Sequence, residues 1–317
     1  MNPNYKSFEE RVPDLQYLNL VQRIRDEGRY TKTRFQTNGT FSHFGLAPLD
    51  YKFENGFPMI PERSLKGSWA KYVNELAAFI NGAVTVVEMS GYGTDTTWAN
   101  WWSTWVYEEK CKIFGLPANH LGGASYGAIL AQFPTPNGTF NQFEHLLKQM
   151  REMPDLRTHM VTTWYPPGAL QHSDLVRDVV VAPCHGTDVK YTIIDGFLTC
   201  NHVQRSVDLT VGGTGNIVQW AALELWMAHV LDLVPLDYIH YFMDAQIYED
   251  QMEKVDNELL AKEYLTETDW RYVRGDRAFP TLRVKEDAPK DFFAFRAEHF
   301  ELTDYNPHLG IKFPVTE

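Results

Sequence analysis

The chain has 317 residues, of which 44% are hydrophobic and 22% charged, and its formal net charge is −12 at pH 7. This apolar content can fill a sizeable core, so a disordered or collagen-like chain is excluded. The excess of 41 acidic over 29 basic residues argues against a general binder of nucleic acid or of anionic membranes, although local arginines can still hold an anionic substrate.

The cysteine usage predicts a protein of the reducing cytoplasm. There are three cysteines and no Cys-x-x-Cys pair, so neither a disulfide framework nor a structural zinc site is expected. The N-terminal segment lacks the apolar stretch of a signal peptide. The longest apolar stretch, residues 217–233, is interrupted by polar side chains and predicts a buried helix rather than a membrane span. No repeat or linker divides the chain, so we expect one domain over residues 1–317.

Periodicity predicts helices first and a sheet later. Helical spacing occurs over residues 17–27, 69–80 and 140–150. Short β-branched or alternating runs then predict strands over residues 158–164, 178–182, 189–194 and 197–204, with Asp195-Gly196 as a hairpin turn between the last two. Residues 217–233 and 252–264 return to helix, and residues 238–242, 280–284 and 299–305 are predicted to be extended. This mixture indicates an α+β fold.

The segment Val181-Ala-Pro-Cys-His185 is the first candidate for chemistry. A cysteine thiolate is a strong soft nucleophile. Cys184 follows a predicted strand and a proline, at a loop position where a side chain can be presented to a ligand. The alternative is an unreactive buried cysteine, and the adjacent His185 alone does not decide between them.

A second polar cluster ends the predicted hairpin. On an extended chain Gln204, Ser206 and Asp208 share one face, and Arg205 points to the other. An arginine and a serine together can hold a phosphate group, the arginine through two parallel hydrogen bonds. The alternative is a solvated strand end.

Two further segments fit a flat polar ligand. Gly212 and its neighbours precede the apolar helix and permit close approach of the backbone to a ligand. Asn216 either caps that helix or offers its amide donor and acceptor to one edge of a uracil ring. The tryptophans of Thr97-Trp-Ala-Asn-Trp-Trp102 either fill the core or form a stacking wall for a heterocycle.

The order of these motifs resembles the thymidylate synthase family. Cys184-His185, Gln204-Arg-Ser-x-Asp208, Gly212 with Asn216-Ile217, and Asp244-Ala-Gln-Ile-Tyr248 follow the family pattern in sequence. Further matching segments extend the resemblance over nearly the whole chain: Gln16-Tyr-Leu, Phe57-Pro, Asn74-Glu-Leu-Ala-Ala-Phe79, Trp98 with Trp101, residues 122–127, Pro154-Asp-Leu-Arg157, Asp304-Tyr-Asn-Pro-His308 and residues 311–315.

The resemblance implies a thymidylate synthase-like α+β fold and a role for each matching residue. Cys184 would add to C6 of a pyrimidine nucleotide, and Arg205 would keep the thiol ionised. Glu75, Tyr126 and His185 would organise the water and proton network. Trp98, Trp101, Asp208 and Gly212 would face 5,10-methylenetetrahydrofolate, a co-substrate, with no metal required. The nucleotide would be held by Arg34, Gln204, Arg205, Ser206, Asn216, Gln246, Tyr248 and Arg157, the last donated by the partner subunit of a homodimer.

The chain departs from the family pattern at five places. The loop at residues 33–39 is longer but keeps Arg34, and Thr158 replaces a second arginine. Gln246 replaces the usual histidine, Val181 the usual leucine, and Glu317 an apolar last residue. The last two departures would admit water near the reacting carbon, and water rather than hydride at that carbon yields a hydroxymethyl group.

The leading interpretation is a deoxyuridylate hydroxymethylase of the cytoplasm, such as a virus with modified DNA would encode. A thymidylate synthase is the close alternative, since Trp98 is retained to shield the intermediate. A CMP or dCMP hydroxymethylase is the third interpretation, kept open by Gln246. A non-catalytic homologue that binds a nucleotide or RNA is the fourth, and the retained Cys184, Arg205 and Glu75 argue against it.

Overall fold

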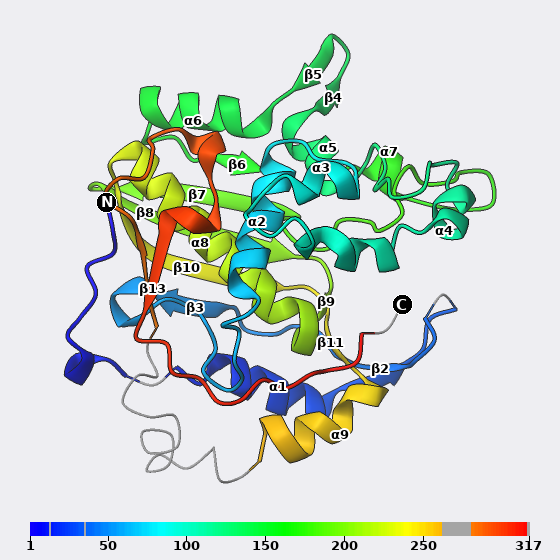
Figure 1. Cartoon of the computed structure of the whole chain (residues 1–317), viewed down its shortest axis with the longest axis horizontal. Coiled ribbons are helices and arrows are strands. Elements are labelled where there is room, and N and C mark those ends of the chain that lie inside the picture. The colour runs from blue at the N-terminus through cyan, green and yellow to red at the C-terminus, as the bar shows by residue number, and fades with distance from the viewer. Residues whose placement is uncertain (13, 35, 262–279, 316–317) are drawn as a thin grey trace.

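The computed structural model describes residues 1–12, 14–34, 36–261 and 280–315. The described chain is α+β, as predicted, with helices packed around mixed sheets (Figure 1). Its α-helices are α1 (Gln16–Glu27), α2 (Trp69–Ile80), α3 (Val86–Ser90), α4 (Glu108–Ile113), α5 (Tyr126–Ala131), α6 (Gln142–Glu152), α7 (Pro166–Ala169), α8 (Thr214–Leu231) and α9 (Met252–Lys254).

Two larger sheets carry the framework. The five-stranded sheet has the order β3-β10-β8-β7-β6 and the four-stranded sheet the order β1-β2-β11-β9; β4 pairs with β5, and β12 with β13. The strands are β1 (Arg29–Thr31), β2 (Thr40–His43), β3 (Leu49–Lys52), β4 (Phe133–Thr135), β5 (Gly138–Phe140), β6 (Met160–Val161), β7 (Asp188–Ile194), β8 (Phe197–Gln204), β9 (Val207–Asp208), β10 (Val234–Phe242), β11 (Ala245–Tyr248), β12 (Thr281–Val284) and β13 (Phe300–Thr303).

The hairpin between β7 and β8 forms where the sequence predicts it. Asp195 and Gly196 have φ angles of 51° and 83°, the left-handed conformation that a two-residue hairpin turn requires. Along β8 every second residue is buried, so one face of the sheet packs on the core. The strand β8 begins and ends at the predicted residues.

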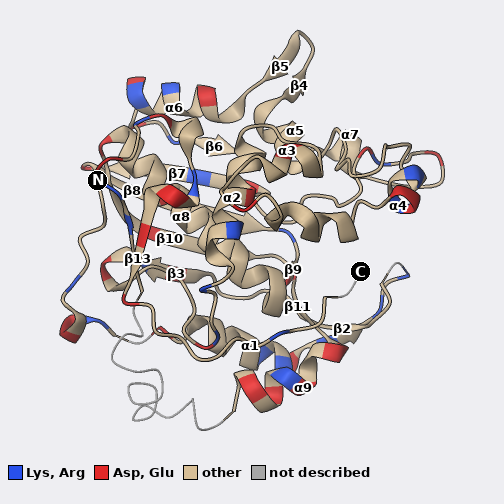
Figure 2. Ribbon diagram, viewed as in Figure 1, with Lys and Arg blue, Asp and Glu red and all other residues tan. Residues whose placement is uncertain are grey.

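The helix α8 is the centre of the molecule. It packs against α2 and against strands β8 and β10, and its residues are buried all round rather than on one stripe. It begins at Thr214, after a π-helical turn over Leu209–Gly213, which is three residues earlier than predicted. Charged residues gather instead on the outer helices α1, α4, α6 and α9 (Figure 2). No helix in the described residues is long and apolar enough to cross a membrane.

Compared with the face of the five-stranded sheet that packs against α8, the face that points away from this helix is less buried. Lys190, Thr192, Asn201 and Ile239 on this face remain partly exposed, and Tyr241 is 38% exposed. A mixed polar and apolar sheet face of this kind is available for contact with another protein surface.

Both central strands change sheets at the same level. The chain passes from β8, which ends at Gln204, to β9, which begins at Val207. It does the same from β10, which ends at Phe242, to β11, which begins at Ala245. Backbone bonds from Met243 N to Gln204 O (2.9 Å) and from Val207 N to Asp244 O (3.0 Å) hold the two crossings together. The intervening residues therefore lie at a junction of two sheets, outside the regular strands of either sheet.

Three predicted elements are wrong or shorter. Residues 178–182 form no strand, although Val179 and Val180 are buried, because their backbone bonds singly to a loop, as from Val180 N to Leu121 O (3.0 Å). Of residues 158–164 only β6 is a strand, since its partner β7 pairs with just two residues. The helix predicted over residues 252–264 is α9 followed by a π-helical turn that ends at Leu259, and its residues 262–264 lie outside the described chain.

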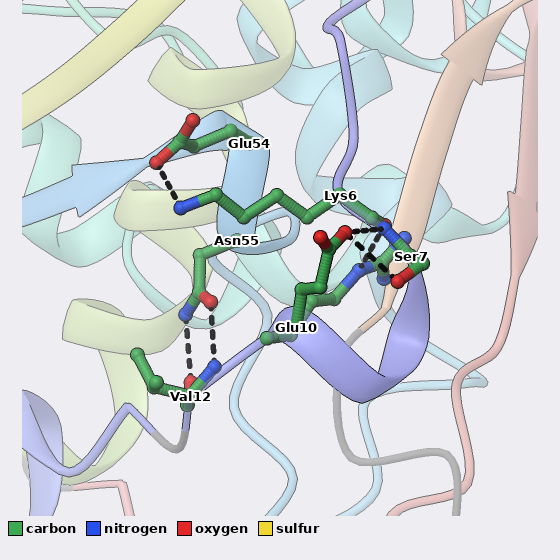
Figure 3. Close-up of polar contacts among 7 residues, drawn as sticks. Lys6, Ser7, Glu10, Val12, Glu54 and Asn55 are labelled. Atoms are coloured by element: carbon green, nitrogen blue, oxygen red, sulfur yellow. Dashed lines mark hydrogen bonds and ion pairs between the residues drawn. The ribbon is translucent and has the colours of Figure 1, made fainter.

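The N-terminal segment is fastened to the body by polar contacts (Figure 3). Lys6 pairs with Glu54, and Val12 exchanges two hydrogen bonds with the Asn55 amide (2.8 and 2.7 Å). Closer to the N-terminus, the side chains of Asn2 and Tyr5 form hydrogen bonds with the backbone of β12. The first twelve residues thus join the 3-10 turn at Phe53–Asn55 to the small sheet β12-β13.

Candidate active site

Cys184 lies in a loop and is partly exposed, whereas Cys111 and Cys200 are fully buried. Tyr126, the first residue of α5, places its hydroxyl oxygen 3.2 Å from the sulfur and accepts the backbone N–H of Cys184 over 2.8 Å. Because that oxygen already accepts from the main chain, its own proton is free to point at the sulfur. The structure thus gives Cys184 a hydrogen-bond donor suited to a thiolate.

Burial and neighbouring side chains act in opposite directions on the ionisation of Cys184. Burial raises the pKa of the thiol, and the Tyr126 hydroxyl and the Arg205 guanidinium oppose this rise without cancelling it. Arg205 itself lies over the ring of Trp164 and donates to the carbonyl oxygens of Pro183 and Ala182. The Arg205 guanidinium therefore acts to lower the pKa of the thiol, and its role in keeping Cys184 ionised stays a prediction.

His185 is held as a neutral imidazole. The indole N–H of Trp220 donates to His185 Nδ1 over 3.0 Å, so the ring proton is on Nε2. Burial lowers the pKa of His185 to about 3, and its ring stacks on Tyr126 with centroids 4.3 Å apart. His185 can consequently donate a hydrogen bond from Nε2 but carries no charge near neutral pH.

Glu75 of α2 is buried and held from two sides. Trp102 donates its indole N–H to Oε1 over 2.6 Å, and the Gln219 amide donates to Oε2. Burial raises the pKa of Glu75 to about 7, and these two hydrogen bonds limit the rise. A carboxyl group that titrates near neutral pH can pass a proton in either direction. Sequence reasoning assigned no role to Trp102 or Gln219.

The polar strand end lies at the junction of the two sheets. The Ser206 hydroxyl donates to Asp244 Oδ2 (3.4 Å) and accepts from the Gln246 amide (3.5 Å). The backbone N–H of Arg205 donates to Cys184 O over 2.8 Å, which joins this strand end to the loop that carries Cys184. Gln204 is fully buried and directs its amide to Ser206 O and His240. Asp244 was not foreseen; burial raises the pKa of its carboxyl group.

Asp208 organises the turn that precedes α8. Its Oδ1 accepts from the backbone of Thr210 and Val211, and its Oδ2 accepts from the Gln251 amide over 2.7 Å. Burial raises the pKa of Asp208 to about 6. Gln251 was also missed by sequence reasoning, because a buried glutamine has no spacing pattern that identifies it.

Asn216 is the third residue of α8 and is 8% exposed. The interpretation of Asn216 as a helix cap is therefore wrong: the π-helical turn precedes the helix, and the side chain of Asn216 is not needed at its end. A Cβ atom at Gly212 would lie 3.8 Å from the Asn216 amide nitrogen, so the Gly212 backbone and the Asn216 side chain are neighbours.

The tryptophan segment forms a 3-10 helix over Trp98–Thr104. Trp98 and Trp101 meet edge to face with centroids 6.5 Å apart, and Trp101 stacks on Tyr72. The indole N–H of Trp98 is buried without a hydrogen-bond partner in the described structure, whereas the Trp101 indole acts on the Glu75 carboxyl group and helps to limit its pKa. Flat aromatic surface beside an unsatisfied donor suits a heterocycle that carries acceptors, as a folate does.

Of the remaining predicted nucleotide ligands, Tyr248 is joined to Asp208 through Gln251, which accepts the Tyr248 backbone N–H over 3.0 Å. Tyr248 accepts the Gln36 amide over 2.7 Å, and burial raises the pKa of its phenol to about 12. Arg34 and Arg157 are exposed, and within the described residues no hydrogen bond links either of them to the rest of the site. The described residues also contain no cluster of three or more potential metal ligands.

The C-terminal segment is fastened beside Asp208. Gln251 donates to Pro314 O (3.0 Å) as well as to Asp208, while Arg63 donates to Ile311 O, Thr210 O and Thr214 and lies over the ring of Phe313. Arg63 has no assigned role in the sequence interpretation. Glu317, which the product prediction uses, lies outside the described residues.

The model of a family described as thymidylate synthase matches residues 15–317, which is nearly the entire chain.

Proposed function

Because the chain belongs to the thymidylate synthase family, and so catalyses folate-dependent one-carbon transfer to a pyrimidine nucleotide, we propose that its substrate is dUMP and its product 5-hydroxymethyl-dUMP. The overall reaction takes dUMP, 5,10-methylenetetrahydrofolate and water to 5-hydroxymethyl-dUMP and tetrahydrofolate. The arrangement of Cys184 beneath Tyr126 and beside Arg205 is the observation that carries the proposal.

Each step assigns work to a residue of this chain. The Cys184 thiolate forms a bond to C6 of the uracil ring, which places negative charge on O4 and C5 and makes C5 nucleophilic. The folate supplies the one-carbon unit at the oxidation level of formaldehyde. Asn216 matches the uracil edge with a donor and an acceptor, and donors near O4 stabilise the charge that develops there.

Removal of the C5 proton needs a base with a suitable pKa. Glu75, with a pKa raised to about 7, is suited to this task through an intervening water, and Tyr126 is the alternative at the sulfur side. His185 remains neutral and can donate from Nε2 to ordered water. Loss of the C5 proton and cleavage of the bond to folate, which leaves as tetrahydrofolate, give an exocyclic methylene at C5. Water then adds its oxygen to that carbon and gives up a proton to the base, and loss of the Cys184 sulfur as thiolate restores the pyrimidine ring.

The phosphate would be held at the sheet junction by Arg205 and Ser206, with Arg34 and a partner's arginine completing the site. We propose that the protein is a homodimer in which Arg157 reaches the partner's nucleotide. The incompletely covered face of the five-stranded sheet supports a protein contact there. Asp244, close to Ser206, would need to be protonated or screened by arginine when a phosphate dianion binds.

The hydroxymethyl product is supported by Val181, which is one methylene shorter than the usual leucine and is partly exposed beside the nucleophile loop. Buried Trp98, expected to shield the intermediate from water, instead favours the second candidate, thymidylate synthase, whose products are dTMP and dihydrofolate. Mass analysis of the product from dUMP distinguishes them. A gain of CH2O without dihydrofolate supports hydroxymethylation, and a gain of CH2 with dihydrofolate refutes it. Modification of dCMP in place of dUMP would identify a cytidylate hydroxymethylase.

A further inference from the structure

A chain of buried side chains connects two backbone groups of the active site. It begins at the N–H of Gly186, which donates to His202 Nε2 over 2.8 Å. The other nitrogen of His202 lies 2.8 Å from the Tyr238 hydroxyl, which lies 3.2 Å from His240 Nδ1. His240 Nε2 lies 3.0 Å from Gln204 Oε1, and the Gln204 amide donates to Ser206 O over 3.1 Å.

The two ends determine the position of every proton between them. The N–H of Gly186 can only donate, so His202 accepts at Nε2, carries its proton on Nδ1 and donates to Tyr238. The carbonyl of Ser206 can only accept, so Gln204 presents its NH2 there and its oxygen to His240. His240 must then donate from Nε2 and accept from Tyr238 at Nδ1. All five hydrogen bonds therefore run in one direction, and such chains reinforce their members.

The surroundings keep this chain intact. His202, Gln204, Tyr238 and His240 are all 0% exposed, and the ring of Trp220 packs on His202 with centroids 5.0 Å apart. Burial lowers the pKa of both histidines well below the usual value, so both remain neutral. Parallel pairing of β8 with β10 sets His202 opposite His240, which places the four side chains on one face of the sheet.

The ends of the chain are the two loops that must be aligned for reaction. Gly186 follows Cys184 and His185, and Ser206 follows Arg205. We propose that His202, Tyr238, His240 and Gln204 are positioning residues that fix the nucleophile loop relative to the nucleotide phosphate site. This inference rests on the proposed function only in taking Cys184 as the nucleophile and Arg205 with Ser206 as the anion site.

Because all five hydrogen bonds run in one direction, removal of one member affects the hydrogen bonds of the others. In Tyr238→Phe the proton on His202 Nδ1 loses its acceptor. If that proton moves to Nε2, it meets the N–H of Gly186, so two donors face each other two residues from Cys184. The first outcome leaves a buried donor unpaired and favours a shift of His202, and the second breaks the bond to Gly186. Both displace the nucleophile loop and weaken the bond between Tyr126 and the sulfur. A small displacement of a reacting group can lower a rate by about 100-fold.

The test compares Tyr238→Phe with Tyr51→Phe in the full chain. Tyr51 stacks on Tyr238, and its buried hydroxyl has no partner in the described structure, so this control removes a hydroxyl outside the chain. Iodoacetamide alkylation of Cys184, followed by peptide mass mapping, reports the loop without any substrate. Release of tritium from C5-labelled dUMP reports kcat and KM. Gln204→Met, which breaks the opposite end, serves as a second variant if Tyr238→Phe does not fold.

We expect Tyr238→Phe to slow alkylation about tenfold and to lower kcat about 10- to 100-fold with little change in KM, while Tyr51→Phe matches the wild type. The double variant Tyr238→Phe/Gln204→Met should be no slower than the slower single variant. Either substitution alone already interrupts the chain of hydrogen bonds, so the second adds no further loss. Equal rates in the two tyrosine variants, or effects that multiply, overturn the proposal. Wild-type protein without tritium release, but with slowed alkylation in Tyr238→Phe, would refute the proposed function and leave the positioning role intact.

Discussion

The hydroxyl oxygen of Tyr126 accepts the backbone N–H of Cys184 and also lies 3.2 Å from its sulfur. One phenol thereby holds the main chain of Cys184 and faces its side chain. Burial raises the pKa of the thiol, so the Tyr126 proton is a principal means of stabilising a thiolate before the substrate arrives. This geometry makes the reactivity of Cys184 depend on a residue 58 positions away in the sequence.

Replacement of Tyr126 by Phe should raise the pKa of Cys184 further, because the hydrogen bond to the thiolate is lost. A hydrogen bond to a charged group contributes about 1.5–3 kcal/mol, so alkylation of Cys184 near neutral pH should slow roughly 10- to 100-fold. The rate of iodoacetamide alkylation, measured over a range of pH, gives the pKa directly. An unchanged pKa would show that Tyr126 does not donate to the sulfur.

Glu75 should make stability depend on pH in a way that Glu75→Gln abolishes. Its pKa is raised from an ordinary 4.5 to about 7 on folding, so the folded state binds more protons between these values. The stability contribution is therefore complete below about pH 4.5 and declines as the pH rises to about 7, by about 3 kcal/mol. Urea unfolding at pH 5 and pH 8 measures this decline.

The wild type should lose more stability than Glu75→Gln between these two pH values. Asp208, whose pKa is raised to about 6, has the same sign but is present in both proteins and cancels in the comparison. Gln219 can rotate its amide to accept from the new glutamine, since its oxygen is buried without a partner in the described structure. Parallel pH dependences in the two proteins would contradict the raised pKa of Glu75.

Gly186 should not tolerate a side chain. Its φ angle is 62°, and a Cβ atom there would approach the ring of Trp220 to 2.3 Å. Gly186→Ala should lower the free energy of unfolding by about 2–4 kcal/mol and misplace His185, because backbone strain and overpacking add. Gly196→Ala is the matched control: its φ is 83°, but nothing lies within 4 Å of the added carbon. Equal losses in thermal unfolding would mean that contact with Trp220 is unimportant.

Asn216→Asp should shift the base preference towards cytosine. An ionised carboxylate offers acceptors only, which suit the 4-amino group of cytosine and oppose the acceptor O4 of uracil. We expect the ratio of kcat/KM for dUMP to that for dCMP to fall about 100-fold, as for a buried polar mismatch. Asn141→Asp, at the start of α6, serves as a control because that asparagine caps a helix. An unaltered ratio would remove Asn216 from base recognition.

Arg63→Met should free the C-terminal segment. Arg63 contributes a carbonyl bond to Ile311 and a ring contact to Phe313, and these would be lost. Carboxypeptidase should then shorten the chain about tenfold faster, because the digestible end is released more often. Arg296→Met is matched to it: Arg296 also bonds two carbonyls and covers the ring of Tyr92, but it does not touch the segment. Similar digestion of both variants would show that the segment is held elsewhere.

The sequence by itself determined those features that local chemistry or a motif records. The Asp195-Gly196 turn and the alternation of β8 follow from the backbone and side-chain preferences of a few neighbouring residues, and both were predicted. The family also follows from the ordered motifs around Cys184 and Arg205. Domain organisation and the roles of the predicted site residues stay predictions.

Only the tertiary structure decided which side chains meet across the chain. Residues 178–182 read as a strand, but a strand needs a partner ladder, and the fold offers them only a loop. Trp102 and Gln219 reach Glu75 from distant elements, as Gln251 reaches Asp208. The buried path from Gly186 to Ser206 exists because parallel pairing sets β10 beside β8. Burial, pKa and proton direction arise from three-dimensional neighbours, which residue spacing along one strand cannot specify.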